Sequence, residues 1–575
     1  MNGLLLLIIA IVVLATGYIL YGGWLCKKWG IDVSKEETPA HTMEDGIDYV
    51  PAKAPVLMGH HFSSIAGAGP ITGPISALSL GFGWLPATLW ILIGGIFVGG
   101  VHDFGALIAS IKHGGKSIGE IISANMSVRA KRLFIIFSYL TLILVVAAFA
   151  SIVAGTFGIT DATGAAVPDA VVDTNASVAM VSLLFIVIAI IFGFTVHRRN
   201  SHMLVASGLG ILAIIICMVI GMNFHPFYFS YNTWMIIVAI YIAVASVTPV
   251  WILLQPRDYL TSFLLYAMLA LAFFAVIVNH PSLDAVPLVK SAECTTPVFP
   301  VLFTTIACGA CSGFHSLVSS GTTSKQLNKI SDAKPIAYGG MLLECVLAIL
   351  TICAVSFAFS YNATAETPFQ GATAIFAGGI AGMASSVAGG MGTPLYTILY
   401  TLIVLTYSAF CLTSLDTATR LARFMFQEFW LDSKKGETPQ NVAGYKKVLT
   451  NPYVATIITV VLGVLLGMTG YTKIWALFGS ANQLLAALGL LAVATWLGNV
   501  GKQNRMVVYP MYFMLCVTIA SLVINTKTQL GIISAGEALD WGPYAQVIIG
   551  ILLVIMALVL AFEGVTTLAK SKKAA

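Results

Sequence analysis

The sequence predicts an all-α polytopic membrane protein, and three observations support this. Hydrophobic residues make up 58 % of the 575 residues and charged residues only 9 %, whereas a soluble domain carries about 25 % charged residues. The apolar residues gather in stretches of about 20, the length that an α-helix needs to cross a bilayer. The Lys and Arg residues fall in alternate connecting segments. This composition excludes a soluble enzyme, a secreted domain and a nucleic-acid binder.

Apolar stretches along the chain predict the transmembrane helices. Thirteen are clear: about 3–24, 86–111, 133–154, 176–195, 203–222, 233–253, 259–279, 336–359, 393–415, 453–470, 475–497, 507–524 and 544–566. Two more, 57–80 and 300–321, are long enough but rich in glycine and small polar residues. No basic residue precedes the first stretch, and Lys27 and Lys28 follow it. We therefore interpret it as a retained anchor whose amino end is outside.

The distribution of positive charge supports fifteen crossings. If the spans alternate from an external amino terminus, every Lys and Arg except Lys290, Lys473 and Lys527 falls on the cytoplasmic side. If one early span were missed or added, every later loop would change sides and this bias would be lost. The sequence therefore predicts a multi-pass protein with its carboxyl terminus in the cytoplasm.

The two glycine-rich spans predict an inverted repeat, because each is followed by six further spans. An odd number of spans per half means that the halves insert in opposite directions. The predicted units are 1–56 (anchor and cytoplasmic loop), 57–279 (first repeat), 300–566 (second repeat) and 567–575 (basic tail). Interrupted spans at matching places in inverted halves are typical of a secondary transporter's binding site.

A break inside a span determines which groups can bind a substrate. Freed backbone amides must face a cavity that supplies partners, and the N-terminus of a half-helix attracts a carboxylate. The predicted substrate-binding residues are His60, His61, Ser63, Ser64, Gly67, Gly69, Gly313, His315 and Ser316. The alternative is that the glycines only allow close helix packing.

Ionisable residues inside spans are the candidates for ion coupling, because they are costly at membrane depth. Histidine suits a proton relay near neutral pH. We expect His61, Asp103 and His315 to form the proton-coupling set. The full ion-coupling prediction is Asp103, His102, Glu344, Thr413, Ser414 and Asp416. Alternatively, the histidines are packing residues, Asp103 and Glu344 form structural pairs, and Asp416 pairs with Arg420 one turn later.

Metal and redox chemistry is the second alternative. Cys308 and Cys311 form a C-x-x-C with His315 close behind, and His60, His61, His102 and His315 could surround a metal. No H-E-x-x-H accompanies them, so we predict no resident metal and no cofactor. The cysteines mostly lie in apolar runs and are interpreted as buried hydrophobic residues. No phosphate-binding G-x-x-x-x-G-K-[ST] is present, which argues against ATP-driven transport by this chain.

Several motifs resemble the carbon starvation protein A (CstA) family. They are Asp45-Gly46-Ile47-Asp48-Tyr49-Val50-Pro51, Gly59-His60-His61-Phe62, Ile65-Ala66-Gly67-Ala68-Gly69-Pro70 with Gly73-Pro74, and Ser414-Leu415-Asp416-Thr417-Ala418-Thr419-Arg420. The resemblance implies a nutrient importer of the bacterial inner membrane that is used when carbon is scarce. Peptide uptake and proton-coupled pyruvate uptake are both associated with relatives.

The resemblance also implies an architecture similar to the amino-acid/polyamine/cation transporters. In that architecture, hydroxyls on a late core helix coordinate a coupling cation against the first broken helix, and Thr413 and Ser414 loosely match them. Segment 360–392 would then form a short external helical lid. A linker poor in polar residues is the alternative.

The sequence thus predicts a secondary active importer, and not an enzyme, for small carboxylate-bearing nutrients. Peptides, amino acids and pyruvate remain open as substrates, and H⁺ is favoured over Na⁺ as the coupling ion. The partners are these solutes, the cation and the bilayer, and no nucleic acid. The competing functions are an intramembrane metal or redox protein and a receptor that senses a nutrient without transporting it.

Overall fold

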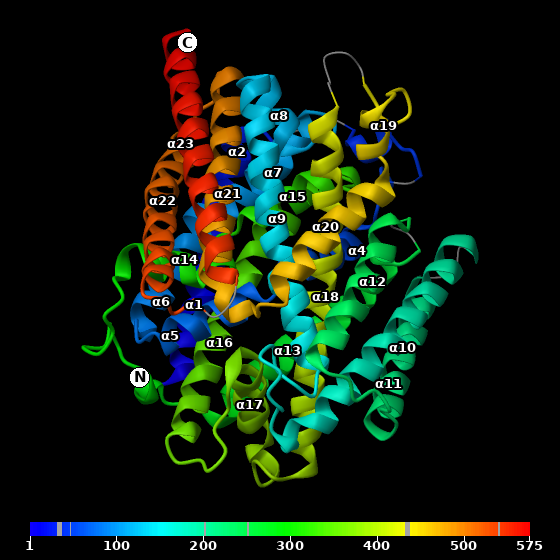
Figure 1. The fold of residues 1–575 in the computed structure, drawn as a ribbon, viewed down its shortest axis with the longest axis vertical. Coiled ribbons are helices and arrows are strands. Elements are labelled where there is room, and N and C mark those ends of the chain that lie inside the picture. The colour runs from blue at the N-terminus through cyan, green and yellow to red at the C-terminus, as the bar shows by residue number, and fades with distance from the viewer. Residues whose placement is uncertain are drawn as a thin grey trace.

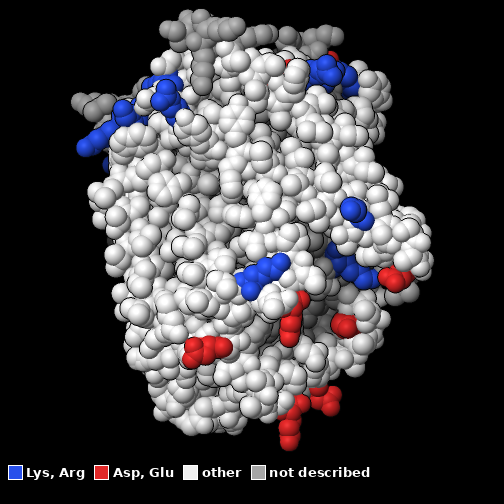
Figure 2. Space-filling view, turned by 90° about the vertical axis from the view of Figure 1, so that its left-hand side faces the viewer, with Lys and Arg blue, Asp and Glu red and all other residues white. Residues whose placement is uncertain are grey.

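The computed structural model describes residues 1–31, 37–46, 48–199, 203–249, 252–431, 437–538 and 541–574. These residues form helices joined by loops, with no β-sheet among them. Many of the helices run roughly along the long axis of the molecule, with the C-terminus at the upper end and the N-terminus in the lower part (Figure 1). The face in Figure 2 carries few charges: some Lys and Arg lie near its upper end, others lie near its middle, and most of the visible Asp and Glu lie in its lower half. This all-α polytopic fold confirms the predicted fold class.

The helices follow in chain order. They are α1 (Gly3–Thr16), α2 (Gly22–Trp29), α3 (Pro39–Thr42), α4 (Ala54–Ile65), α5 (Gly69–Ser79), α6 (Trp84–Gly94), α7 (Gly100–Lys112), α8 (Ile118–Asn125), α9 (Val128–Phe157), α10 (Asp169–Arg199), α11 (Met203–Asn223), α12 (Tyr231–Val247), α13 (Leu254–Asn279), α14 (Val298–Ile306), α15 (Gly313–Gly321), α16 (Gly340–Asn362), α17 (Gly371–Ser385), α18 (Pro394–Trp430), α19 (Tyr445–Leu449), α20 (Pro452–Gly467), α21 (Tyr471–Asn499), α22 (Arg505–Ser534) and α23 (Gly542–Ala574). Wider turns at Gly17–Tyr21, Gly95–Gly99 and Lys334–Gly339 continue α1 into α2, continue α6 into α7 and lead into α16.

Thirteen helical stretches of the described residues are long and apolar enough to cross a membrane, and α12 and α20 are shorter apolar helices. Each of the thirteen clear spans predicted from the sequence coincides with one of these helices. The total of fifteen crossings stays a prediction, because α17 is also of spanning length together with its last turn.

The segment predicted as lid or linker contains a helix. Helix α17 packs against α13, α16 and α18 and lies near the lower end of the molecule (Figure 1). Most of its side chains are buried. The expected short helix is therefore present, and its role as a lid stays a prediction.

Helix α18 is longer than the predicted span 393–415, because it continues to Trp430. Asp416 therefore lies well inside the helix and not at its end. The continuation is possible because its charged side chains have partners: Arg420 donates to the carbonyls of Ala245 (3.0 Å) and Thr248.

Both predicted breaks are present. Residues 66–68 separate α4 from α5, and residues 307–312 separate α14 from α15. The two broken spans lie against each other in reversed order, since α5 contacts α14 while α4 contacts α15. Helices α5 and α15 are almost entirely buried, and so is α4 from Gly59 to its end. This crossing positions the candidate site.

Candidate proton-coupling and substrate site

A buried cluster of two carboxylates and two histidines lies beside the second break. Asp103 of α7 contacts both imidazoles: its Oδ1 is 2.7 Å from His102 Nδ1, and its Oδ2 is 2.7 Å from His315 Nδ1. On the other side of that ring, His315 Nε2 is 3.3 Å from Glu344 Oε2 on α16. All four side chains are completely buried. We call His102, Asp103, His315 and Glu344 the central cluster.

The break in the second span places His315 in this cluster. His315 is the third residue of α15, and the backbone N–H of Phe314 donates to Asn482 Oδ1 of α21 at 2.9 Å. The Asn482 side chain thus satisfies an amide that the break leaves free. Gly489 of α21 provides room for His102, because a Cβ there would lie 2.7 Å from His102 Nε2.

Several polar atoms in this region lack a hydrogen bond within the described part of the chain. They include both carboxylate oxygens of Glu344 and the Nε2 atoms of His60, His61 and His102. Buried polar groups normally have hydrogen-bond partners. Water, a transferable proton or a bound solute would complete these atoms, so the cluster can accept such a partner.

His61 approaches the central cluster from the first broken span. Its Nδ1 is 2.8 Å from Thr323 Oγ1, just after α15. A Cβ on Gly340 of α16 would lie 3.4 Å from the His61 ring, and Gly340 is one helical turn before Glu344. The structure therefore brings the predicted coupling residues His61, Asp103 and His315 into one region, together with His102 and Glu344.

A second buried network surrounds Arg257 at the start of α13. Its guanidinium contacts Asp416 and Tyr241, and its Nη2 is 3.0 Å from Asp258 Oδ1. The Tyr241 hydroxyl donates to Asp416 Oδ2 at 2.8 Å, and His60 Nδ1 is 2.9 Å from Asp258 Oδ2. We call these five residues the Arg257 network.

The alternative interpretation, in which Asp416 pairs with Arg420, is therefore wrong. Asp416 pairs with Arg257, which the charge count had placed in a cytoplasmic connection. The reason is that α13 begins at Leu254 and carries Arg257 and Asp258 into the protein. Sequence reasoning missed Asp258 and Tyr241, although adjacent opposite charges at the start of an apolar span are a usable signal.

The predicted hydroxyls near the two breaks form hydrogen bonds either across helices or within their own helix. Ser414 of α18 donates to the Ser64 carbonyl at 3.0 Å, so α18 meets the first broken span as expected. Thr413 instead donates to Ala409 of its own helix at 3.2 Å. Ser63 donates to the Asp258 carbonyl at 3.4 Å, and Ser316 to the Gly313 carbonyl at 2.8 Å.

The glycines at the breaks allow very close packing. A Cβ on Gly69 would lie 2.5 Å from Cys308 Sγ, and one on Gly313 would lie 2.2 Å from the Asn482 carbonyl oxygen. A Cβ on Gly67 would lie 3.0 Å from Ser414 Oγ. Close packing thus accounts for these glycines in this conformation, and their contact with substrate stays a prediction.

The geometry separates the residues of the metal alternative. His60 contacts Asp258 and His61 contacts Thr323, whereas His102 and His315 contact Asp103. Donor atoms of Cys308, His315 and Glu344 do lie within 4.8 Å of one another, but Cys311 does not join them. All nine cysteines are free. Cys516 is exposed, contrary to the buried interpretation, because its apolar helix α22 is only half covered by protein.

A polar cavity of about 700 Å³ opens at the end of α15. Ser320 and Gly321 line it. Charged side chains of both signs also line it: Lys116, Lys325, Arg423, Asp48, Glu120 and Glu428.

Two broken spans with ionisable groups buried at their crossing are typical of secondary transporters, and this is the class that the fold and site define. The model of the family "Carbon starvation protein CstA" matches residues 2–369 and 356–521. The chain belongs to this family.

Relatives agree with this assignment. The chain is 32 % identical to the peptide transporter CstA of Bacillus subtilis (strain 168), over 88 % of this chain and 87 % of that protein. Its identity to the peptide transporter CstA of Escherichia coli (strain K12) is 30 %, covering 88 % and 78 %. The pyruvate/proton symporter BtsT of the same strain is 35 % identical over 56 % of this chain and 44 % of that protein.

Two solved structures resemble the chain in outline. The Eremococcus coleocola manganese transporter in complex with an aromatic bis-isothiourea compound has a TM-score of 0.49 at 13 % identity, covering 92 % of this chain and 99 % of that one. MhsT in complex with L-phenylalanine has a TM-score of 0.46 at 13 % identity, covering 89 % and 99 %.

Proposed function

We propose that this protein is a secondary active importer that couples entry of a small carboxylate-bearing nutrient to entry of protons. The observation that carries the proposal is the central cluster, in which Asp103 joins two histidines next to a helix break and beside Glu344. The names of the relatives support it, since they include peptide transporters and a pyruvate/proton symporter.

The central cluster is suited to proton coupling because its charge depends on how many protons it holds. Charged groups at membrane depth are costly, so a change of protonation alters the relative free energies of the conformations. His315 contacts a carboxylate on each side of its ring. A proton that moves between His315 and Glu344 would therefore link the position of the second break, which carries His315, to the position of α16, which carries Glu344.

The substrate carboxylate would bind at the two breaks, through backbone amides and the hydroxyls of Ser63, Ser64 and Ser316, with Gly67, Gly69 and Gly313 allowing its approach. Binding there requires the packed glycines to separate, as alternating access implies.

We place the protein in the bacterial cytoplasmic membrane with its amino end outside. The units 57–279 and 300–566 would move against each other as inverted repeats. Substrate and proton are translocated without covalent change, so we assign no enzymatic activity to the chain.

Uptake by proteoliposomes tests the proposal. We expect an inside-alkaline pH gradient to drive accumulation of labelled pyruvate or dipeptide, and a protonophore to abolish it. Glu344→Gln should abolish gradient-driven accumulation while leaving substrate exchange measurable. Uptake that ignores the gradient would refute proton coupling.

Sodium is the second candidate for the coupling ion, because Ser414 lies at the first break. Replacing Na⁺ by choline at a fixed pH gradient distinguishes the two ions. We expect no change in uptake, whereas a loss would assign the coupling to Na⁺.

A further inference from the structure

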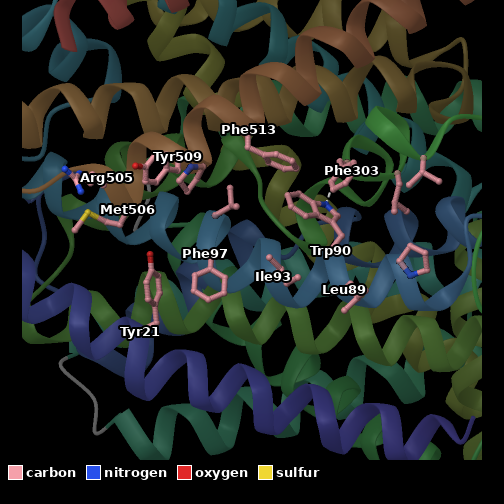
Figure 3. Close-up of a pocket in the computed structure, with 15 residues that line it drawn as sticks. Tyr21, Leu89, Trp90, Ile93, Phe97, Phe303, Arg505, Met506, Tyr509 and Phe513 are labelled. Atoms are coloured by element: carbon pink, nitrogen blue, oxygen red, sulfur yellow. Dashed lines mark hydrogen bonds between the residues drawn. The ribbon is translucent and has the colours of Figure 1, made fainter. Parts of the chain in front are cut away.

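An aromatic groove of about 660 Å³ lies on the outside of the helix assembly, away from both buried networks. Helix α6 and the turn after it form one wall, α14 and α22 form the other, and Tyr21 closes one end. Figure 3 shows Trp90, Phe303 and Phe513 grouped along it, with Tyr21, Met506, Tyr509 and Arg505 toward one end.

We propose that this groove binds one acyl chain of an anionic phospholipid whose phosphate is held at Arg505. The proposal commits to a lipid of the leaflet that contacts the basic end of the groove. It does not depend on the transport function proposed above.

The groove has a rigid apolar lining. Trp90 packs on Phe303 with ring centroids 4.9 Å apart, and Phe513 lies 5.4 Å from Phe303. The Trp90 indole N–H donates to the Phe303 carbonyl at 3.2 Å, so its polar atom does not need solvent. Ile93 and Phe97 on the rim remain 53 % and 45 % exposed, which leaves apolar surface for an acyl chain to cover.

The wall formed by α6 and the turn after it is about as long as the hydrocarbon part of one leaflet is thick. Pro86 and Phe97 both line it and are eleven positions apart on a continuous helical stretch, which corresponds to roughly 16 Å at the rise of an α-helix. Half of a bilayer's hydrocarbon core is about 15 Å. This stretch of the wall therefore matches the length of one acyl chain, and Arg505 and Met506 lie beyond its Phe97 end (Figure 3).

Positive charge at one end selects the headgroup. Arg505 is exposed, and it forms no ion pair within the described part of the chain. Lys502 is three residues earlier and donates to the carbonyl of Trp29, directly after Lys27 and Lys28 in the last turn of α2. Basic pockets between transmembrane helices on the cytoplasmic side bind anionic headgroups. If a second copy of this chain covered the groove instead of a lipid, that copy would have to place an anionic group beside Arg505.

Quenching of Trp90 by brominated acyl chains tests the proposal in nanodiscs. The difference between the native protein and Trp90→Phe isolates this residue among the ten tryptophans. We expect brominated phosphatidylglycerol to quench Trp90 at about a fivefold lower mole fraction than brominated phosphatidylcholine, the preference expected from one basic residue. Arg505→Gln should remove the preference, and the matched exposed control Arg129→Gln should keep it.

Two results would overturn the proposal. Equal quenching by the two lipids would show that no headgroup is selected. Protection of Trp90 from both lipids in a dimeric protein would show that a second copy covers the groove.

Discussion

Asp103 is a buried carboxylate that joins two histidine rings. It is completely buried and contacts two histidines that come from different helices. A carboxylate in this position orients both rings, and it determines which nitrogen of each ring carries a proton. Its charge therefore matters more than its size.

The first prediction concerns this charge. Asp103→Asn should lower uptake driven by a pH gradient roughly ten- to a hundredfold, because a hydrogen bond to a charged group contributes about 1.5–3 kcal/mol. The measurement is initial uptake in proteoliposomes. Glu366→Gln, an exposed acidic residue, is the matched control and should transport normally. Native uptake by Asp103→Asn would remove Asp103 from the coupling set.

The second prediction concerns the Arg257 network. Arg257→Met should destabilise the protein by about 3–5 kcal/mol, because it leaves the carboxylates of Asp258 and Asp416 buried without their cation. Asp416→Asn should cost less, since the amide can still bond to Tyr241. Thermal unfolding in detergent measures both effects.

A double variant separates pairing from packing at this site. Arg257→Met with Asp416→Leu should recover part of the lost melting temperature, because one unpaired charge is removed together with its partner. If the double variant loses as much melting temperature as Arg257→Met and Asp416→Leu lose together as single variants, the two side chains are not coupled.

At the scale of elements, the crossing of the two broken spans depends on missing side chains. The first span contributes Gly69 where the second contributes Cys308, and a Cβ on Gly69 would lie 2.3 Å from Cys308 Cβ. Close packing of Gly69 against the Cys308 side chain therefore holds the breaks together, as well as hydrogen bonds.

The third prediction follows from this contact. Gly69→Ala should destabilise the protein by about 1–3 kcal/mol, the usual cost of overpacking, and Cys308→Gly should partly restore stability in the same chain. Gly155→Ala on α9 is the control, because a Cβ there would meet nothing within 4 Å. Thermal unfolding of the three variants checks this, and an unchanged melting temperature for Gly69→Ala would refute the close crossing.

At the scale of the whole molecule, the C-terminus lies at the upper end and the N-terminus in the lower part (Figure 1), and the odd number of crossings stays a prediction of the charge pattern. The fourth prediction concerns which loops face the outside of the cell and which face the cytoplasm. In a Cys294→Ser background, an impermeant maleimide should label Glu366→Cys in intact cells and Lys329→Cys only after permeabilisation. Both positions are exposed in loops. The reverse pattern would invert the proposed topology.

The sequence by itself determined the membrane class, the thirteen clear spans and both breaks, because span length, glycine content and charge bias are local properties of the chain. It also determined the family through motifs such as Gly59-His60-His61-Phe62. It identified His61, Asp103, His315 and Glu344 as candidates, since ionisable side chains in an apolar span are visible without a structure.

Only the tertiary structure decided which of these residues are partners. Arg257 and Asp416 are 159 positions apart, and Asp103 and His315 are 212 apart, so no local spacing connects them. Helix packing brings these charges together, and burial makes the pairing energetically necessary. For the same reason Asp416 could not be assigned to Arg257 from the sequence, where Arg420 was the nearest cation along the helix.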